Sequence, residues 1–115
     1  IAKSIAIGNP TDGYYALMVA RQSGGGAYAV TDEEALAGMK LLAQTEGIFA
    51  EVVGGVVIGA LKKLAASGII KRDEVTVAFI TGAGPRTQEI VSDIVQPLNV
   101  RSTLESVEEV LGAPV

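Results

Sequence analysis

Two short segments of this chain carry residues whose types and spacing could support chemistry. Residues 46–51 place the carboxylates of Glu46 and Glu51 on either side of an apolar patch. Residues 81–84 place the hydroxyl of Thr81 at the end of an apolar run, directly before two glycines. Paired carboxylates can act in general acid–base catalysis, and glycines after a strand let the backbone approach a ligand closely.

Each feature also has a structural interpretation. Glu51 could interact with the positive end of the helix that follows it, and capping is the reading that its position favours. Thr81 could satisfy a backbone carbonyl where a strand ends. The glycines at 82 and 84 do not complete a dinucleotide-binding fingerprint, because Arg86 and Thr87 stand where a third glycine would be expected.

Other polar residues have equally plain interpretations. Lys62 and Lys63 lie on a helix flank, whereas a lysine that forms a Schiff base needs a desolvated position beside its cofactor. Solvated lysines are the better interpretation of this pair. Ser4 and Asn9 could bind a substrate, or they could form turns beside the neighbouring glycine and proline.

Composition narrows the possible chemistry. The chain of 115 residues contains no Cys and no His, which excludes disulfides, thiolate catalysis, zinc sites and imidazole acid–base catalysis within it. The net charge of −4 and the absence of a large basic cluster argue against a nucleic acid as partner. No apolar stretch approaches the roughly 20 residues of a membrane span, so we expect a cytoplasmic protein that does not enter the membrane.

The elements that must position these residues can be traced along the chain. Apolar residues at helical spacing predict helices over residues 13–22, 31–44 and 52–66. Asp12 can cap the first helix, and Thr31 with Glu34 fits a capping box for the second. Residues 4–7 are interpreted as an extended entry segment, since Gly8-Asn9-Pro10 ends them with turn residues.

Two segments are predicted to be strands. Residues 75–80 form an almost uninterrupted apolar run bounded by turn residues, which is typical of a central strand covered on both faces. Residues 27–30 are a shorter second strand. This order of elements predicts a single α/β domain over residues 1–115, with a parallel sheet and helices flanking it in three layers. Ligands bind beyond the carboxyl ends of such strands, which is where Thr81 lies.

The last part of the chain is predicted to contain two more helices. The first runs over residues 88–95 and is stopped by Pro97. Ser102 and Glu105 fit a second capping box for a terminal helix that ends near Gly112. The composition contains 49% hydrophobic residues, mainly aliphatic, which suits helices packed on a buried sheet.

Three segments in one order give the chain a family resemblance. They are Ser4-Ile5-Ala6-Ile7-Gly8-Asn9-Pro10, Thr45-Glu46-Gly47-Ile48-Phe49-Ala50-Glu51 and Ile80-Thr81-Gly82-Ala83-Gly84. Together they resemble the carboxy-terminal part of threonine synthases, over roughly residues 1–90. Val52-Val53 stand where that family commonly has Pro-Ala, and Pro85-Arg86 replace a frequent Leu-Lys. These departures leave related enzymes such as threonine deaminase open.

The resemblance implies a fold type II enzyme that depends on pyridoxal phosphate. Threonine synthases convert O-phosphohomoserine to threonine and phosphate. By this resemblance Thr81 is the residue placed at the pyridine nitrogen of the cofactor, Gly82 lies beside the ring, and Glu46 lines the pocket. The lysine that forms the Schiff base and the loop that holds the cofactor phosphate belong to upstream parts of the family that are not matched here.

From this we expect the chain to be a carboxy-terminal fragment of the cofactor domain, inactive alone because it contains no catalytic residue of that kind. It should bind pyridoxal phosphate weakly or not at all. A strand as apolar as residues 75–80 needs neighbours on both edges, so a homo-oligomer is expected. The alternative is a small self-standing α/β module, in which residues 82–86 bind an anionic ligand.

Overall fold

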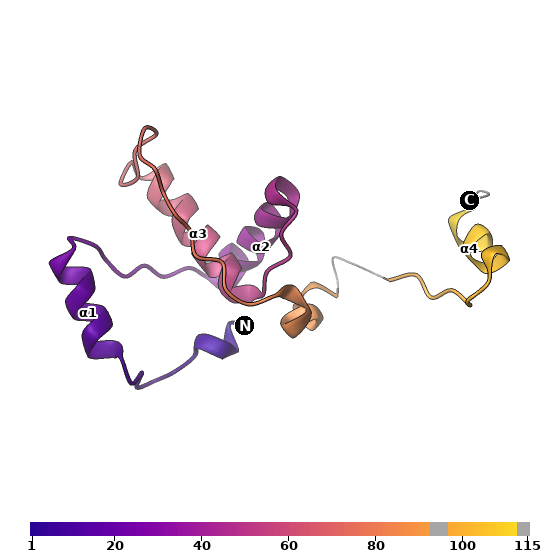
Figure 1. Cartoon of the computed structure of the whole chain (residues 1–115), viewed down its shortest axis with the longest axis horizontal. Coiled ribbons are helices and arrows are strands. Elements are labelled where there is room, and N and C mark those ends of the chain that lie inside the picture. Colours follow the sequence, from indigo (N-terminus) through magenta and orange to yellow (C-terminus); the bar gives the residue numbers. More distant parts are fainter. Residues whose placement is uncertain (93–96, 113–115) are drawn as a thin grey trace.

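The computed structural model describes residues 1–92 and 97–112 of the chain. In order, the elements are the 3-10 helix η1 (Lys3–Ile5), the α-helices α1 (Gly13–Gln22), α2 (Asp32–Glu46) and α3 (Val52–Ala66), the 3-10 helix η2 (Gly84–Val91), and α4 (Leu104–Leu111). Helices α2 and α3 form the packed centre, η2 lies against α3, and α1 and α4 stand apart on opposite sides (Figure 1). The candidate site is therefore positioned mainly by the α2–α3 pair.

Glycines allow α2 and α3 to cross with their backbones in close contact. A Cβ atom on Gly38 would collide with the carbonyl oxygen of Gly55, and one on Gly55 would collide with the carbonyl oxygen of Ala35. Beside this crossing, Ala35, Met39 and Val52 form the buried apolar cluster. Close backbone approach thus takes the place of large interlocking side chains at the centre of the fold.

The predicted capping box at the start of α2 is confirmed. The N–H of Glu34 donates to Thr31 Oγ1 at 3.2 Å, and the N–H of Thr31 donates to Glu34 Oε2 at 2.7 Å. Lys63 of α3 also donates to Glu34 Oε2 at 2.8 Å and to the carbonyl oxygen of Ala29 at 3.1 Å. Donation by the Lys63 ammonium, followed by that of the Thr31 N–H, lowers the pKa of Glu34. Lys63 is therefore an ion-pair partner that ties α3 to α2, and its ammonium is not simply solvated.

Helix bounds follow the sequence prediction closely. The predicted limits of the helices at 13–22 and 52–66 are confirmed, and α2 continues to Glu46, two residues beyond its predicted end. Gly47 then ends α2 with a left-handed backbone, at φ +67°. Asp12 stands at the N-cap of α1, but its side chain makes no capping hydrogen bond, so that part of the prediction is wrong. Residues 3–5 form one 3-10 turn in place of a purely extended entry.

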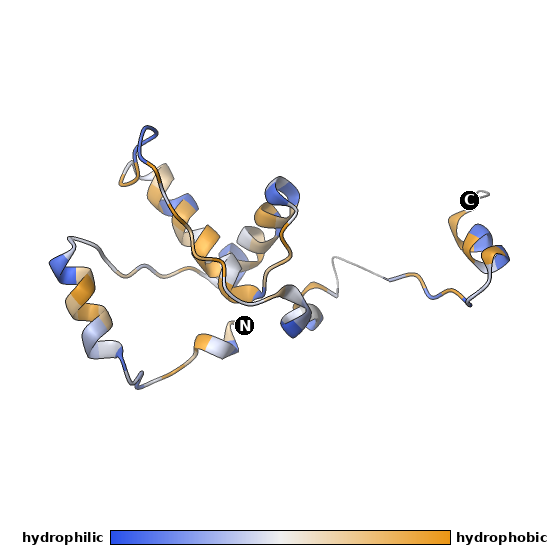
Figure 2. Ribbon diagram, in the orientation of Figure 1, coloured by the Kyte–Doolittle hydropathy of each residue, from blue (hydrophilic) through white to orange (hydrophobic). Residues whose placement is uncertain are grey.

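The parallel sheet is not confirmed. Within the two described ranges no strand forms, and residues 27–30 and 75–80 have no regular secondary structure. The side chains of Val75, Val77 and Phe79 are 96%, 74% and 79% exposed. Figure 2 shows hydrophobic colour along the chain that follows α3. A strand needs hydrogen-bonding partners along its edges, and the described residues supply none to this run.

The carboxy-terminal helices begin at other residues than predicted. In place of a helix over 88–95, η2 spans Gly84–Val91, with non-helical backbone at Thr87; residues 93–95 lie outside the described part. Helix α4 is capped by Thr103, whose hydroxyl accepts from the N–H of Ser106 at 3.3 Å. The predicted capping box at Ser102 and Glu105 is therefore wrong by one residue, whereas the helix end near Gly112 is confirmed.

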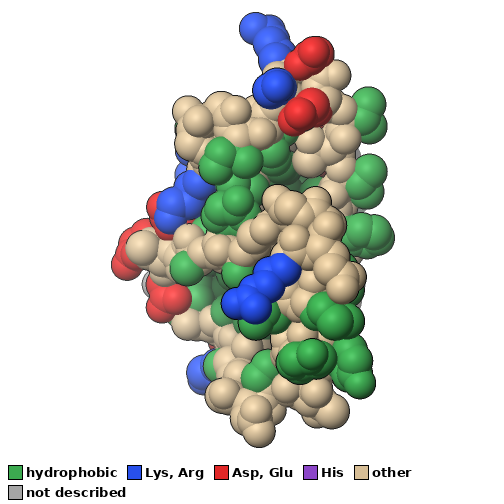
Figure 3. Space-filling model, turned by 90° about the vertical axis from the view of Figure 1, so that its left-hand side faces the viewer, with side chains coloured by type: hydrophobic (Ala, Val, Ile, Leu, Met, Phe, Trp, Pro, Cys, Tyr) green, Lys and Arg blue, Asp and Glu red, His purple; other side chains and the backbone are tan. Residues whose placement is uncertain are grey.

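The described elements are spread out rather than gathered on one core. The Cα radius of gyration is 18.9 Å, whereas a compact chain of this length would have about 13 Å. From the side on which α1 lies, many apolar side chains are seen at the surface (Figure 3). The assignment of residues 1–115 to a single domain stays a prediction. No helix built from the described residues is both long and apolar enough to cross a membrane.

Candidate functional site

The two segments that could support chemistry lie side by side in the structure. Ala50 and Ala83 form an antiparallel β-bridge. On one side of this bridge the N–H of Glu51 donates to the carbonyl oxygen of Gly82 at 3.1 Å. On the other side the N–H of Gly84 donates to the carbonyl oxygen of Phe49 at 2.9 Å. The loop between α2 and α3 is thereby fastened to the glycine turn that follows the apolar run.

Both glycines of this turn are required by close contacts. Gly82 has φ +78°, a conformation that residues with a side chain rarely adopt. A Cβ atom there would also collide with the carboxylate of Glu51. A Cβ atom on Gly84 would collide with the ring of Phe49. The turn is therefore shaped by the same loop to which it is hydrogen-bonded.

Glu51 has an unusual environment for a carboxylate. The residue is only 8% exposed and stands at the N-cap of α3. Its side chain makes no capping hydrogen bond, so the predicted capping role is not formed through the carboxylate. The positive end of α3 still favours a negative charge at this position.

Of the residues that the resemblance assigns to the cofactor, Thr81 is exposed and precedes the Gly82 turn. Its hydroxyl forms no hydrogen bond with the rest of the described chain. Glu46 is the exposed last residue of α2. The structure thus brings Gly82 against Glu51, but no described hydrogen bond or ion pair joins Glu46 to Thr81 or Gly82. The roles of Thr81, Gly82 and Glu46 stay predictions.

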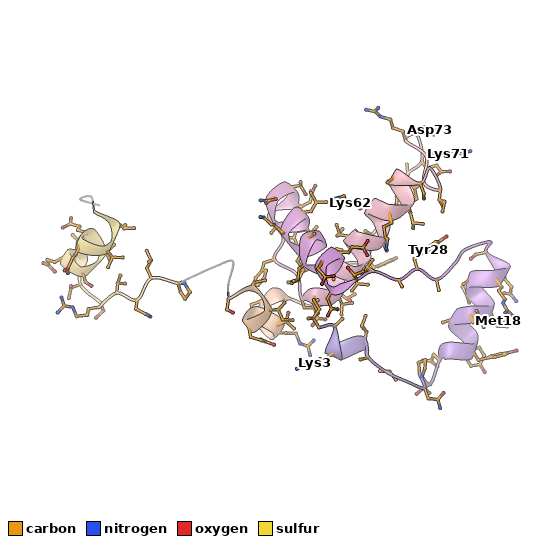
Figure 4. The ribbon with its side chains drawn as sticks, turned by 180° about the vertical axis from the view of Figure 1, so that it is seen from behind. Lys3, Met18, Tyr28, Lys62, Lys71 and Asp73 are labelled. Atoms are coloured by element: carbon orange, nitrogen blue, oxygen red, sulfur yellow. The ribbon has the colours of Figure 1, made fainter. Side chains whose placement is uncertain are left out.

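An open pocket lies next to the fastened turn. It has a volume of about 420 Å³ and is lined by three parts of the chain: Ile1, Lys3 and Ser4; Glu51; and Arg86, Thr87, Glu89 and Ile90. Lys3 lies on the N-terminal turn near η2 (Figure 4). Ser4, for which the sequence allowed either substrate binding or a turn, is among the lining residues. Asn9, Thr81 and Glu46 do not line this pocket.

Sequence reasoning did not single out Lys3 or Thr87 as site residues, and it included Arg86 only in the alternative in which the loop at residues 82–86 binds an anionic ligand. The hydroxyl oxygen of Thr87 is buried and has no hydrogen-bond partner in the described structure. No signal in the sequence distinguishes this threonine, which lies at the non-helical point inside η2. The available signal was a charged residue two positions after the second glycine, at Arg86.

The residues at the turn fit part of the cofactor that the resemblance implies. A free hydroxyl at Thr81, placed by the backbone of Gly82, is the kind of group that can hydrogen-bond the nitrogen of a pyridine ring. Neither Lys62 nor Lys63 lines the described pocket beside the turn, and Lys63 is held by Glu34. At the turn, only the Thr81 hydroxyl has the chemistry expected for a contact with the cofactor ring, and that contact stays a prediction.

Comparisons with known proteins agree with the sequence resemblance. Residues 1–82 match the model of the family described as pyridoxal-phosphate dependent enzymes. A threonine synthase of Methanocaldococcus jannaschii is 51% identical over 84 residues, which are 73% of this chain and 21% of that protein. One of Methanosarcina acetivorans is 38% identical over 112 residues, 96% of this chain and 28% of that protein. One of Halalkalibacterium halodurans is 48% identical over 84 residues, covering 73% and 24%. The chain thus spans about a quarter of the length of these relatives.

Proposed function

The chain belongs to the family of pyridoxal-phosphate-dependent enzymes, and on that premise we propose that it is the carboxy-terminal part of a threonine synthase. The complete enzyme would convert O-phosphohomoserine and water to threonine and phosphate. The observation that carries the proposal is the pairing of Phe49–Glu51 with Gly82–Gly84, since it fixes the turn next to Thr81. The similarity to threonine synthases of three organisms supports the choice of reaction.

In the proposed enzyme Thr81 holds the nitrogen edge of the cofactor ring. When bound, pyridoxal phosphate withdraws electrons from the amino-acid substrate and so makes its C–H bonds more acidic. A hydroxyl is a neutral partner, so Thr81 would leave the ring nitrogen largely unprotonated, whereas a carboxylate would favour the protonated form. Gly82 keeps the backbone next to this hydroxyl in a fixed, left-handed conformation. Glu46 would line the same pocket from the end of α2.

The proposal also accounts for the unpaired apolar run. We infer that residues 75–80 become a strand of the parallel sheet of a fold type II enzyme when the remaining three-quarters of the protein is present. Their present exposure supports this, because Val75, Val77 and Phe79 are all at least 74% exposed and have no partner strand within the described chain. A cytoplasmic location and self-association are further predictions of the proposal.

The experiment that tests the assigned role is a Thr81→Val substitution in the complete enzyme. Valine keeps the shape of threonine and removes the hydroxyl, so turnover of O-phosphohomoserine should fall about tenfold or more. The absorbance spectrum of the bound cofactor should also change. Thr76→Val is the matched control, because it makes the same substitution within the apolar run that leads to Thr81. If Thr81→Val leaves both turnover and spectrum unaltered, Thr81 serves only the structure of the chain.

A further inference from the structure

The side chain of Glu51 covers the turn that follows Thr81. A Cβ atom on Gly82 would collide with three consecutive atoms of this side chain, Cγ, Cδ and Oε1. The main-chain N–H of Glu51 also donates to the carbonyl oxygen of Gly82 at 3.1 Å. The backbone and the side chain of one residue therefore both contact Gly82, whose φ of +78° is left-handed.

Glu51 is itself held in place by the start of α3. It is 8% exposed and is the N-cap residue of this helix. Its carbonyl oxygen accepts from the N–H of Gly54 at 2.9 Å, and the positive end of the helix favours its negative charge. A side chain packed in this way has little rotamer freedom, so it can fix the backbone that it covers.

The residue before Thr81 contacts the same helix. Ile80 Cγ2 lies 3.3 Å from the position that a Cβ atom on Gly54 would occupy, and Ile80 is half-buried. Thr81 therefore lies between two residues, Ile80 and Gly82, that contact the start of α3. Thr81 itself is exposed, so its position is fixed by these two neighbours and not by its own burial.

We propose that Glu51 is a positioning residue for Thr81. Its side chain fills the space above Gly82, keeps the turn in one conformation, and so directs the Thr81 hydroxyl to the nitrogen of the cofactor ring. This role rests on the proposed function, which assigns that contact to Thr81. The shape of the Glu51 side chain carries the effect more than its charge, because Cγ and Cδ lie over Gly82 as well as Oε1.

The first test needs no cofactor and uses the 115-residue chain. Gly82→Ala should lower the midpoint of urea unfolding, partly because the new methyl group collides with Glu51. Glu51→Ala removes this collision, so Gly82→Ala should lower the midpoint less in the Glu51→Ala chain than in the unaltered chain. Gly68→Ala is the matched control: Gly68 has φ +73° and no atom within 4 Å of a Cβ, so its effect should be equal in both chains.

The second test measures kcat and the absorbance of the bound cofactor in the complete enzyme. Glu51→Ala should lower kcat about tenfold and change the spectrum as Thr81→Val does, because a displaced group loses much of its catalytic effect. Once Thr81→Val has removed the hydroxyl, adding Glu51→Ala should lower kcat less than about twofold. Glu109→Ala makes the same substitution at an exposed residue of α4 and should leave kcat unchanged.

Two conservative variants separate shape from charge. Glu51→Gln keeps the shape of the side chain and removes its charge, so kcat should stay within about threefold of the unaltered enzyme. Glu51→Asp keeps the charge but is one methylene shorter, so it should lower kcat more than Glu51→Gln does. This comparison also decides the question if Glu51→Ala prevents folding.

Several results would overturn the positioning role. One is an equal effect of Gly82→Ala in the two chains of the first test. Others are an unaltered kcat and spectrum in Glu51→Ala, a tenfold loss when Glu51→Ala is added to Thr81→Val, and a kcat of Glu51→Gln below that of Glu51→Asp. With Thr81→Val itself lowering turnover, each of these leaves the proposed function standing. If Thr81→Val has no effect, the role of Thr81 is wrong and that of Glu51 falls with it.

Discussion

The main-chain N–H of Glu51 donates to the carbonyl oxygen of Gly82 at 3.1 Å, and the Glu51 carboxylate occupies the space where a side chain at position 82 would begin. One residue of the α2–α3 loop therefore holds the glycine turn through its backbone and shapes it through its side chain. Because Thr81 directly precedes this turn, the relationship connects helix packing to the proposed cofactor contact.

Replacing Gly82 by Ala should destabilise the chain by about 2 kcal/mol or more. Part of this cost comes from the positive φ, and the rest from the contact with Glu51. Gly68→Ala is the matched control, since Gly68 has φ +73° and no atom within 4 Å of the position of a Cβ. Urea unfolding followed by circular dichroism gives both free energies. Equal losses for the two variants would mean that Glu51 does not constrain the turn.

Replacing Gly55 by Ala should separate α2 from α3. The new methyl group would collide with the carbonyl oxygen of Ala35 and lie 2.6 Å from Met39 Cγ. Overpacking of this kind costs about 1–3 kcal/mol. The measurement is again the free energy of unfolding, with Gly8→Ala as control because nothing lies within 4 Å of a Cβ there. If the Gly55→Ala and Gly8→Ala variants have the same free energy of unfolding, the close crossing of α2 and α3 is contradicted.

Acid should weaken the start of α2 through Glu34. Its pKa is lowered in the folded chain, first by donation from Lys63 and then by the N–H of Thr31. A lowered pKa contributes stability above the unfolded value of about 4.3 and loses it as the pH falls through the folded value. Stability measured from pH 7 to pH 3 should therefore fall less steeply in Glu34→Gln than in the unaltered chain. Parallel curves would show that the pair between Glu34 and Lys63 contributes nothing.

Local patterns in the sequence predicted α1, α2 and α3 well, because the causes of these helices lie within a few residues, but they misplaced the starts of η2 and α4. The Thr31–Glu34 capping box and the limits of α1 and α3 are examples. The run at 75–80 has the composition of a central strand, but strand formation depends on partners elsewhere in a protein. The contact between Glu51 and Gly82 could not be derived either, since it depends on how the α2–α3 loop meets a turn far along the chain.

The exposed apolar run should make the isolated chain self-associate. Val75, Val77 and Phe79 are highly exposed, and residues at alternate positions would share one face if the run paired as a strand. Replacing Val77 and Phe79 by Lys should shift sedimentation at micromolar concentration from a dimer or larger species towards the monomer. Thr76→Lys adds charge on the opposite face and should have a smaller effect. If the unaltered chain sediments as a monomer and its unfolding does not depend on concentration, its core is stable without a partner. That result would favour the self-standing module.

The central claim is that this chain supplies the Thr81 side of a threonine synthase and lacks the groups needed for turnover. Its most direct test adds pyridoxal phosphate and O-phosphohomoserine to the purified 115-residue chain while cofactor absorbance and phosphate release are recorded. We predict weak cofactor binding and no phosphate release, because most of the groups that would hold and orient the reactants are absent. A stoichiometric absorbance band together with phosphate release would contradict the account.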